Sequence, residues 1–261
     1  MIATVVAVLA VVAAVAFLGL RDGSGDAEPG AAPVAATSDA PAPPTGPPTE
    51  PPAGQPVEPA PVEPANPVLP DATVGSCTYT SDPAGPSRPV TTPTEADLRT
   101  GTVTADVATS VGKLTFSLDG AAAPCAVASF VSLARQGFYD DTVCHRLVTD
   151  PSGPALLQCG DPSTTAPGTG GPGYAYAEEA LDGATYDRGT IALAKTAAPA
   201  STGSQFFLVI GDVPLPPEYT PVGRVTQGLE ALDPVAAAGS EPPGDGAPLT
   251  EVRLTTVTTS G

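Results

Sequence analysis

The stretch ASFVSLARQGFYDDTVCHRL (128–147) gives the clearest indication of the fold. Its first half continues a helix that we predict over Pro124–Arg135, because apolar side chains recur there every three or four residues. Pro124 stands at the start of this helix and Gly137 just past its end, the positions that each residue favours. The apolar run Val143–Val148 follows and is typical of a strand. This region therefore predicts a helix that turns directly into a sheet.

On both sides of this stretch, most segments have the sequence pattern of short strands. Alternation of apolar and polar residues predicts a hairpin over Thr102–Leu118. A second helix is predicted at Leu229–Ala238, where Pro234 removes a hydrogen bond unless the helix restarts after Asp233. Other apolar runs predict strands at Ala155–Gln158, Thr190–Ala194, Gln205–Ile210, Val222–Thr226 and Glu251–Thr258. Two helices are too few to connect seven or eight parallel strands, so we expect a mainly β fold, a closed antiparallel barrel capped by two helices.

The composition narrows the possible partners. The chain of 261 residues carries 10 basic and 28 acidic residues, a formal net charge of -18. This balance argues against nucleic-acid binding, which needs cations to replace phosphate counterions, and against docking on anionic lipid. The 34 prolines are distributed unevenly, which indicates separate segments along the chain.

Four segments follow from this unevenness. Residues 1–21 contain an uncharged apolar run that would span about 29 Å as a helix, so we favour a transmembrane anchor over a cleaved secretory signal. Residues 22–70 form an acidic Pro/Ala-rich linker, either an extended stalk or a disordered tether. Residues 71–100 are an N-terminal extension of the folded domain at 101–261. We expect this domain to lie outside the cytoplasm, membrane-anchored or, alternatively, secreted.

The four cysteines favour disulfides over a metal site. Cys77, Cys125, Cys144 and Cys159 form no Cys-x-x-Cys pair, and an even count behind an apolar N-terminus favours two disulfides. Three pairings are possible, and the spacing does not choose among them. A zinc site built by three of the cysteines with His145 is the less favoured alternative, so we expect no metal.

Three further motifs have ordinary interpretations. His145, the single histidine, is more readily a residue packed beside a strand than a catalytic imidazole. The glycine-rich GTGGPG at 168–173 lacks the Gly-Lys-Ser/Thr ending of a phosphate loop, so we interpret it as a turn that admits a close backbone approach. Glu178 and Glu179 would face opposite sides of a strand, and we expect both to be solvated.

The stretch 128–147 resembles the cyclophilin-type peptidyl-prolyl cis-trans isomerases, whose first helix runs into a Gly-Phe/Tyr-Tyr/Phe-Asp-x-Thr turn and then His-Arg. Three more blocks follow in the family's order: LQCGDPSTTAPGTGGPGY (157–174), RGTIALAKTAAPASTGSQFFLVIGD (188–212) and PLPPEYTPVGRVTQGLEAL (214–232). The similarity covers roughly Gly101 to Thr258. It implies an eight-stranded antiparallel barrel closed by two helices, and an isomerase that needs no cofactor and acts on proline-containing polypeptides. We expect a monomer.

The resemblance assigns the catalytic role to Arg146. Rotation about an X-Pro bond needs only the loss of amide resonance, across a barrier of ~18–20 kcal/mol. The prolyl nitrogen becomes basic as the amide twists, and a fixed cation that hydrogen-bonds to it favours the twisted state. A surface salt-bridge arginine is the alternative interpretation of Arg146. Gln205 is implied to hold the substrate carbonyl or to orient Arg146.

The remaining site residues also follow from the family motifs. Phe207 is implied as the floor of a proline pocket with Leu156 and Leu215 as its walls, whereas Phe206 should face the core. Gln158 would stabilise Arg146, and Gly168 would admit substrate backbone. Other expected substrate-binding residues are Ala155, Ala194 and Tyr219.

Several of these positions depart from the family pattern. Ala155 stands where a phenylalanine is usual, Lys195 lies in the region of a common asparagine, and Tyr219 and Pro214 replace a frequent histidine and tryptophan. Ala155 and Lys195 keep a rival function open, a non-catalytic proline-binding or chaperone module with the same fold. A third possibility is a structural surface protein whose active part is the stalk, against which the intact site motifs argue.

Overall fold

The computed structural model describes residues 66–149, 155–164, 166–211 and 214–260. The expected anchor at 1–21 and nearly all of the expected linker at 22–70 lie outside these residues. Within them, no helix combines the length and the apolar character needed to cross a membrane.

Both predicted helices are present. Helix α1 spans Pro124–Arg135, as predicted, and its buried side chains pack against the sheet, with Phe130 and Leu133 almost fully covered. The second helical region begins as a 3-10 turn, η2 (Leu229–Leu232), and restarts as α2 (Asp233–Ala238). The restart places Pro234 in the first turn of α2, where its missing N–H costs no helical hydrogen bond. A short 3-10 turn, η1 (Glu95–Asp97), precedes the sheet.

The main sheet is antiparallel and contains eleven of the strands in the described part of the chain, in the order β12-β13-β6-β7-β10-β9-β11-β4-β3-β14-β5. The predicted hairpin is confirmed, because β3 pairs with β4 without a break in register. The bounds are β3 Thr102–Thr109, β4 Gly112–Asp119, β5 Thr142–Val143, β6 Arg146–Thr149, β7 Ala155–Cys159, β9 Thr190–Leu193, β10 Phe206–Val209, β11 Pro221–Gln227, β12 Ser240–Glu241, β13 Asp245–Pro248 and β14 Arg253–Ser260.

The expected closed eight-stranded barrel is not found among these residues. The sheet is open, with β12 at one end of the hydrogen-bonded order and β5 at the other. Strand β5 is only two residues long, and beyond its pairing with β14 it makes a single isolated bridge, from Val143 to Asp161. One bridge does not continue a ladder, so hydrogen bonding does not close the sheet on itself.

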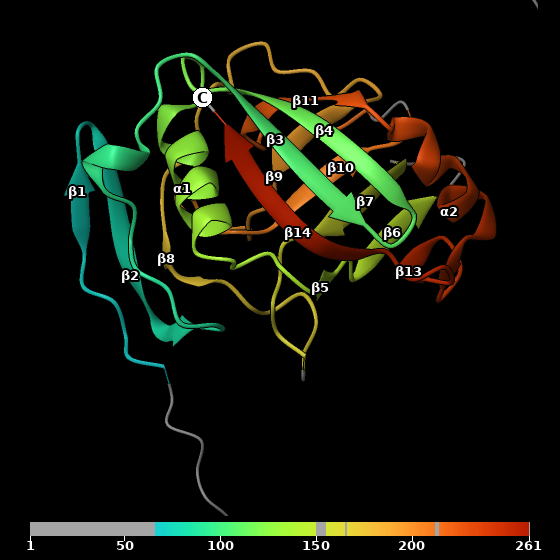
Figure 1. Ribbon diagram of the computed structural model, residues 1–261, viewed down its shortest axis with the longest axis horizontal. Coiled ribbons are helices and arrows are strands. Elements are labelled where there is room, and N and C mark those ends of the chain that lie inside the picture. The colour runs from blue at the N-terminus through green and yellow to red at the C-terminus, as the bar shows by residue number, and fades with distance from the viewer. Residues whose placement is uncertain (1–65, 150–154, 165, 212–213, 261) are drawn as a thin grey trace, which may run out of the picture. The chain divides into compact units, whose positions relative to one another are not determined.

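A second, three-stranded sheet lies beside α1 and was not predicted. It consists of β1 (Ala72–Val74), β2 (Cys77–Pro86) and β8 (Pro172–Ala175), in the order β1-β2-β8. In Figure 1 the β1–β2 hairpin runs along the side of α1 that faces away from β3 and β14. The disulfide Cys77–Cys125 joins β2 to the first turn of α1. The extension is thus attached to the domain by a strand ladder and a covalent bond.

The core has a main cluster and a smaller one that supports the site. The main cluster lies between α1 and the sheet, where Phe116, Phe130, Tyr139 and Phe206 make mutual ring contacts. The second cluster lies on the other side of β10 and comprises Val148, Leu156, Tyr186, Ala192, Phe207 and Val209. The prediction that Phe206 and Phe207 face opposite sides is therefore confirmed.

The adjacent glutamates are not simply solvated, contrary to expectation. Glu179 accepts hydrogen bonds from the backbone N–H groups of Cys125 and Ala126, at 3.2 and 2.8 Å, in the first turn of α1. Burial raises the pKa of Glu179. The first N–H groups of a helix have no hydrogen-bond acceptor within the helix. Here the carboxylate of Glu179, distant in the sequence, accepts two of them.

Candidate active site

Three neighbouring strands place the main site residues on one face. Arg146 of β6 lies opposite Gln158 of β7, and Gln158 lies opposite Phe207 of β10. Side chains on adjacent antiparallel strands at paired positions point to the same side. The strand register thus brings together three residues that are up to 61 positions apart in the sequence.

These residues border a cavity of about 200 Å³, which we call the apolar cavity because aliphatic and aromatic side chains make up most of its lining. Most of the residues expected in the proline pocket line it, including Phe207, Leu156 and Leu215. Its full lining is Arg146, Val148, Leu156, Gln158, Ala194, Lys195, Phe207, Leu215 and Tyr219. Val148 was not anticipated, although it follows from alternation on β6, two residues after Arg146.

Ala155, predicted to bind substrate, is not among the residues that line this cavity. It packs against the main core cluster, and its carbonyl accepts the N–H groups of Ile210 and Gly211. Leu156 and Gln158 of the same strand face the cavity, so alternation turns Ala155 and Leu157 the other way.

The Arg146 guanidinium is held in a fixed direction by Asp245 of β13. Its Nε donates to Asp245 Oδ1 at 2.6 Å and its Nη2 to Oδ2 at 2.7 Å, a bidentate pair. The hydrogen bond to Asp245 raises the pKa of Arg146 and lowers that of the carboxyl. Nη1 points toward Gln158 Oε1 at 3.4 Å, and the Arg146 side chain remains 46% exposed. Arg146 thus forms a salt bridge, as the alternative interpretation predicted. Arg146 also borders the apolar cavity.

Gln205 contacts Arg146 only through Gln158. Gln158 Nε2 donates to Gln205 Oε1 at 2.8 Å, and Gln205 Nε2 donates to the carbonyls of Gly168 and Gly170 at 3.0 and 2.9 Å. The N–H groups of the same two glycines donate to Asp161 Oδ2. Gln205 thus connects the guanidinium side of the site to the glycine-rich turn, and the turn is fixed from both sides.

The aromatic side of the apolar cavity is also held from behind. Tyr219 meets Phe207 edge-on, with ring centroids 5.4 Å apart. The hydroxyl of Tyr186 donates to the Tyr219 carbonyl at 2.8 Å and accepts the Tyr219 N–H at 3.0 Å. Burial raises the pKa of Tyr186, so this hydroxyl keeps its proton and can act as both donor and acceptor. Tyr186 was missed because nothing in the sequence near it marks its contact with residue 219.

His145 is packed under the glycine-rich turn, in agreement with the packed interpretation. A Cβ atom at Gly168, whose φ is +90°, would come within 3.3 Å of the His145 ring. The ring's Nδ1 is buried, and among the described residues it has no hydrogen-bond partner. Burial lowers the pKa of His145. The imidazole is therefore neutral at pH 7 and keeps a second positive charge away from Arg146.

Two disulfides are present, and the pairings are Cys77–Cys125 and Cys144–Cys159. The second joins the residue two before Arg146 to the residue after Gln158, so it links the segment that leads into β6 to the end of β7. The four sulfurs are thus paired in two disulfides.

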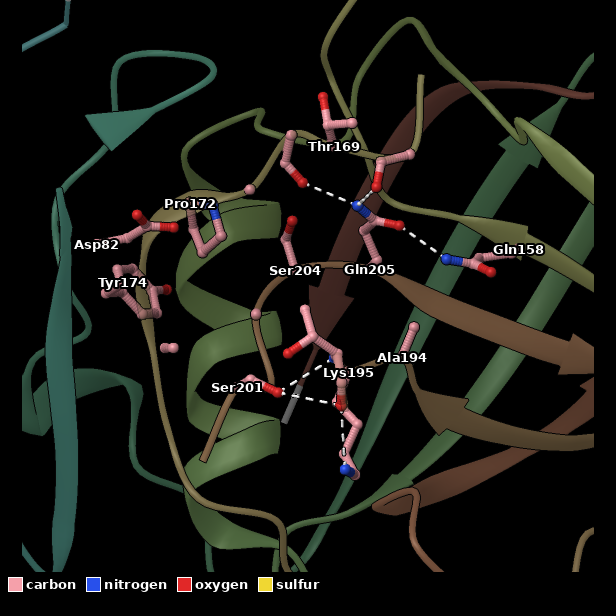
Figure 2. Close-up of a pocket in the computed structure, with 16 residues that line it drawn as sticks. Asp82, Gln158, Thr169, Pro172, Tyr174, Ala194, Lys195, Ser201, Ser204 and Gln205 are labelled. Atoms are coloured by element: carbon pink, nitrogen blue, oxygen red, sulfur yellow. Dashed lines mark hydrogen bonds between the residues drawn. The ribbon is translucent and has the colours of Figure 1, made fainter. Parts of the chain in front are cut away.

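A larger cavity of about 410 Å³ shares part of its wall with the first, and we call it the polar cavity because glycine backbone and Asp, Lys, Gln, Ser and Thr side chains make up most of its lining. Gly168 and Gln205 line this cavity and not the apolar one, whereas Gln158, Ala194 and Lys195 line both. Figure 2 shows Asp82, Pro172 and Tyr174 on one side of it, with Gln205 and Lys195 elsewhere around the wall. Asp82 comes from β2, in the extension, and was not among the expected site residues.

The site can hold an apolar ring in the cavity, with the polar backbone next to that ring facing the Arg146 guanidinium, which Asp245 holds in place. Residues 104–259 match the model of the family described as cyclophilin type peptidyl-prolyl cis-trans isomerase/CLD. The chain belongs to this family and is an isomerase.

Individual relatives agree with this assignment. The probable peptidyl-prolyl cis-trans isomerase B of Mycobacterium tuberculosis is 42% identical over 216 residues, covering 74% of this chain and 67% of the relative. The Mycobacterium leprae protein of the same name is 41% identical over 195 residues, covering 69% and 65%. A Cryptosporidium parvum cyclophilin-type isomerase, whose crystal structure was determined in the presence of the dipeptide Ala-Pro, is 28% identical with a TM-score of 0.53, covering 60% of this chain and 99% of that one.

Proposed function

We propose that this chain catalyses rotation about X-Pro peptide bonds, with the proline ring in the apolar cavity and Arg146 at the prolyl nitrogen. The observation that carries the proposal is the placement of Arg146 on the border of a cavity whose other walls are Phe207, Leu156 and Leu215. A proline ring is apolar whereas the amide next to it is polar, and this cavity offers both surfaces side by side. The Ala-Pro dipeptide named for the Cryptosporidium relative has the same chemistry.

The geometry suits stabilisation of the twisted amide. In the planar amide the nitrogen lone pair is delocalised, and it becomes a hydrogen-bond acceptor only as resonance is lost. A guanidinium held by Asp245 and Gln158 would need little reorganisation to donate to it, and such preorganised donors act on the transition state more than on either planar state. Nη1 is the donor that Asp245 does not use.

We further propose that the substrates are exported or cell-surface proteins whose folding waits on X-Pro exchange, which is slow without a catalyst. Two disulfides favour an oxidising compartment. The apolar run near the N-terminus and the acidic charge of the chain fit a domain that is membrane-anchored, or else secreted, and faces solvent outside the cytoplasm. On this view the domain acts as a monomer on proline-containing chains.

A second candidate is a proline-binding module with negligible catalysis. The observation in its favour is the bidentate Asp245 pair, which offsets part of the Arg146 charge. The two candidates differ only in rate, since both bind proline through the same cavity.

The test is an X-Pro isomerisation assay on the purified full-length protein and its Arg146→Ala variant. Removing a preorganised donor typically lowers catalysis by about 10²-fold or more, and we expect a loss of this size in kcat/KM. Arg224→Ala is the matched control, because Arg224 is an exposed arginine of β11 that lines neither cavity. Binding of a proline peptide without acceleration would support the second candidate. Acceleration that is unchanged in Arg146→Ala would overturn the role of Arg146.

A further inference from the structure

The polar cavity lies where the rest of a bound substrate must pass. It shares Gln158, Ala194 and Lys195 with the apolar cavity, so the two cavities lie next to each other. A polypeptide whose proline occupies the apolar cavity continues past this shared wall. The side chain of a residue near the proline then enters the polar cavity.

One wall of the polar cavity is built by the N-terminal extension. The family match begins at residue 104, so β2 lies outside it. Strand β2 nevertheless pairs with β8, which supplies Pro172, Tyr174 and Ala175 to the same cavity. The Cys77–Cys125 disulfide and the hydrogen bond from the Tyr79 hydroxyl to the Cys125 carbonyl, at 3.0 Å, fix β2 against α1. The extension is therefore a built part of the substrate-facing surface.

The extension contributes one charged side chain to the cavity, Asp82. One of its carboxylate oxygens accepts the Ala84 N–H at 2.9 Å, which fixes the side chain in its own turn. Figure 2 shows the carboxylate directed from β2 toward the cavity, beside Pro172 and Tyr174. Within the described residues its second oxygen accepts no hydrogen bond, and a carboxylate can accept several.

The lining of the polar cavity carries two charged side chains, Asp82 and Lys195, on different sides. Lys195, the one basic residue of the lining, lies on another side of the cavity in Figure 2, and its ammonium donates to the Thr196 carbonyl at 3.1 Å. Glu178 interacts electrostatically with Lys195 and offsets its charge. A side chain that extends toward β2 therefore approaches the Asp82 carboxylate, on a different side of the cavity from Lys195.

We propose that Asp82 makes this isomerase prefer substrates with a lysine or arginine side chain close to the proline. The inference rests on the proposed function and assigns a selectivity to the same site. The preference is confined to one side of the proline, because a chain leaving the apolar cavity enters the polar cavity in one direction only. Exposed ion pairs contribute about 0.2–1 kcal/mol, which corresponds to a preference of about 1.4- to 5-fold in kcat/KM at low salt. Added salt reduces the preference by screening.

The test measures kcat/KM of the full-length protein on proline peptides that carry Lys, Gln or Glu at one of the two positions before or after the proline. We expect Lys to exceed Gln, and Gln to exceed Glu, at one position. Asp82→Asn keeps the acceptor for the Ala84 N–H and should remove the ranking, while Asp82→Lys should invert it. Glu230→Gln is the control for net charge, since Glu230 is an exposed acid of η2 that lines neither cavity.

The outcomes separate this inference from the function on which it rests. If no peptide is isomerised, the proposed function fails. If all peptides are isomerised equally, or if Asp82→Asn keeps the full ranking, the function stands and the selectivity is overturned. An equal loss of ranking in Glu230→Gln would attribute the effect to overall charge and would also overturn the role of Asp82. Circular dichroism melting of each variant checks that the fold is retained.

Discussion

The two adjoining cavities are built in different ways. The apolar cavity is lined mainly by side chains from strands β6, β7 and β10, whose alternation turns Arg146, Gln158 and Phe207 to one face. The polar cavity is lined largely by turns and by backbone around glycine, with a wall from the extension. The first is fixed by strand register, and the second by contacts between segments that are distant in the sequence. We infer that the first sets the reaction and the second sets the choice of substrate.

The largest expected effect comes from releasing the extension. The double variant Cys77→Ser/Cys125→Ser removes a cross-link with a sequence separation of 48, which should lower the free energy of unfolding by about 4 kcal/mol in the chain-entropy model. It should also weaken the Asp82-dependent ranking of peptides while proline turnover persists below the melting temperature. Denaturant unfolding and the peptide series measure both quantities.

The matched control for this variant is Cys144→Ser/Cys159→Ser, whose cross-link has a separation of 15 and a smaller expected loss of about 3 kcal/mol. Because this disulfide lies beside Arg146 and Gln158, its removal should reduce turnover of all peptides alike. If both double variants changed rate and ranking in the same way, the division between the two cavities would be wrong.

The next prediction compares two residues of strand β10, one in the site and one in the core. Phe207→Leu and Phe206→Leu make the same chemical change on opposite faces of β10. Each should cost about 1–2 kcal/mol of stability through the small space that is left. Only Phe207→Leu should lower kcat/KM strongly, by about tenfold, because the floor of the apolar cavity changes shape. Equal losses of specific activity would show that Phe207 does not form a substrate surface.

A smaller effect is expected at Asp245, which positions the guanidinium of the apolar cavity. Asp245→Asn removes the charged bidentate acceptor, so Arg146 should lose its fixed direction and kcat should fall by about fivefold with little change in KM. Asp233→Asn is the control, since it breaks the pair between Arg188 and Asp233 away from both cavities. A rise in kcat would mean that Asp245 mainly weakens the charge of Arg146.

The smallest expected effect depends on pH and concerns His145, whose ring packs against Gly168 of the glycine-rich turn. Burial lowers the pKa of His145 below 6.5, with the charge of Asp161 opposing this shift and that of Arg146 adding to it. The unfolded chain therefore takes up this proton first, so the stability present above about pH 6.5 is lost as the pH falls toward the lower folded-state pKa. Melting temperatures between pH 7.5 and 5 should fall more steeply for the wild type than for His145→Gln. Parallel curves would show that His145 does not contribute to the pH dependence.

The local elements could be predicted because their signals are local. Helix α1 follows from apolar spacing bounded by Pro124 and Gly137, and the β3–β4 hairpin from strict alternation over Thr102–Leu118. The strands of the extension were missed, because β2 ends in a run rich in Pro, Gly and Asp that is typical of turns. It forms a strand only because β1 and β8 supply partners.

The sequence by itself determined the helices, the alternating strands and, through the motifs around Arg146 and Phe207, the family. These features depend on residues a few positions apart, whose spacing decides which side chains share a face. Only the tertiary structure decided the open sheet, the pairing of the cysteines, the Asp245 partner 99 residues from Arg146 and the position of Asp82. The physical reason is that these contacts form between segments whose separation along the chain carries no periodic signal, so folding alone brings them together.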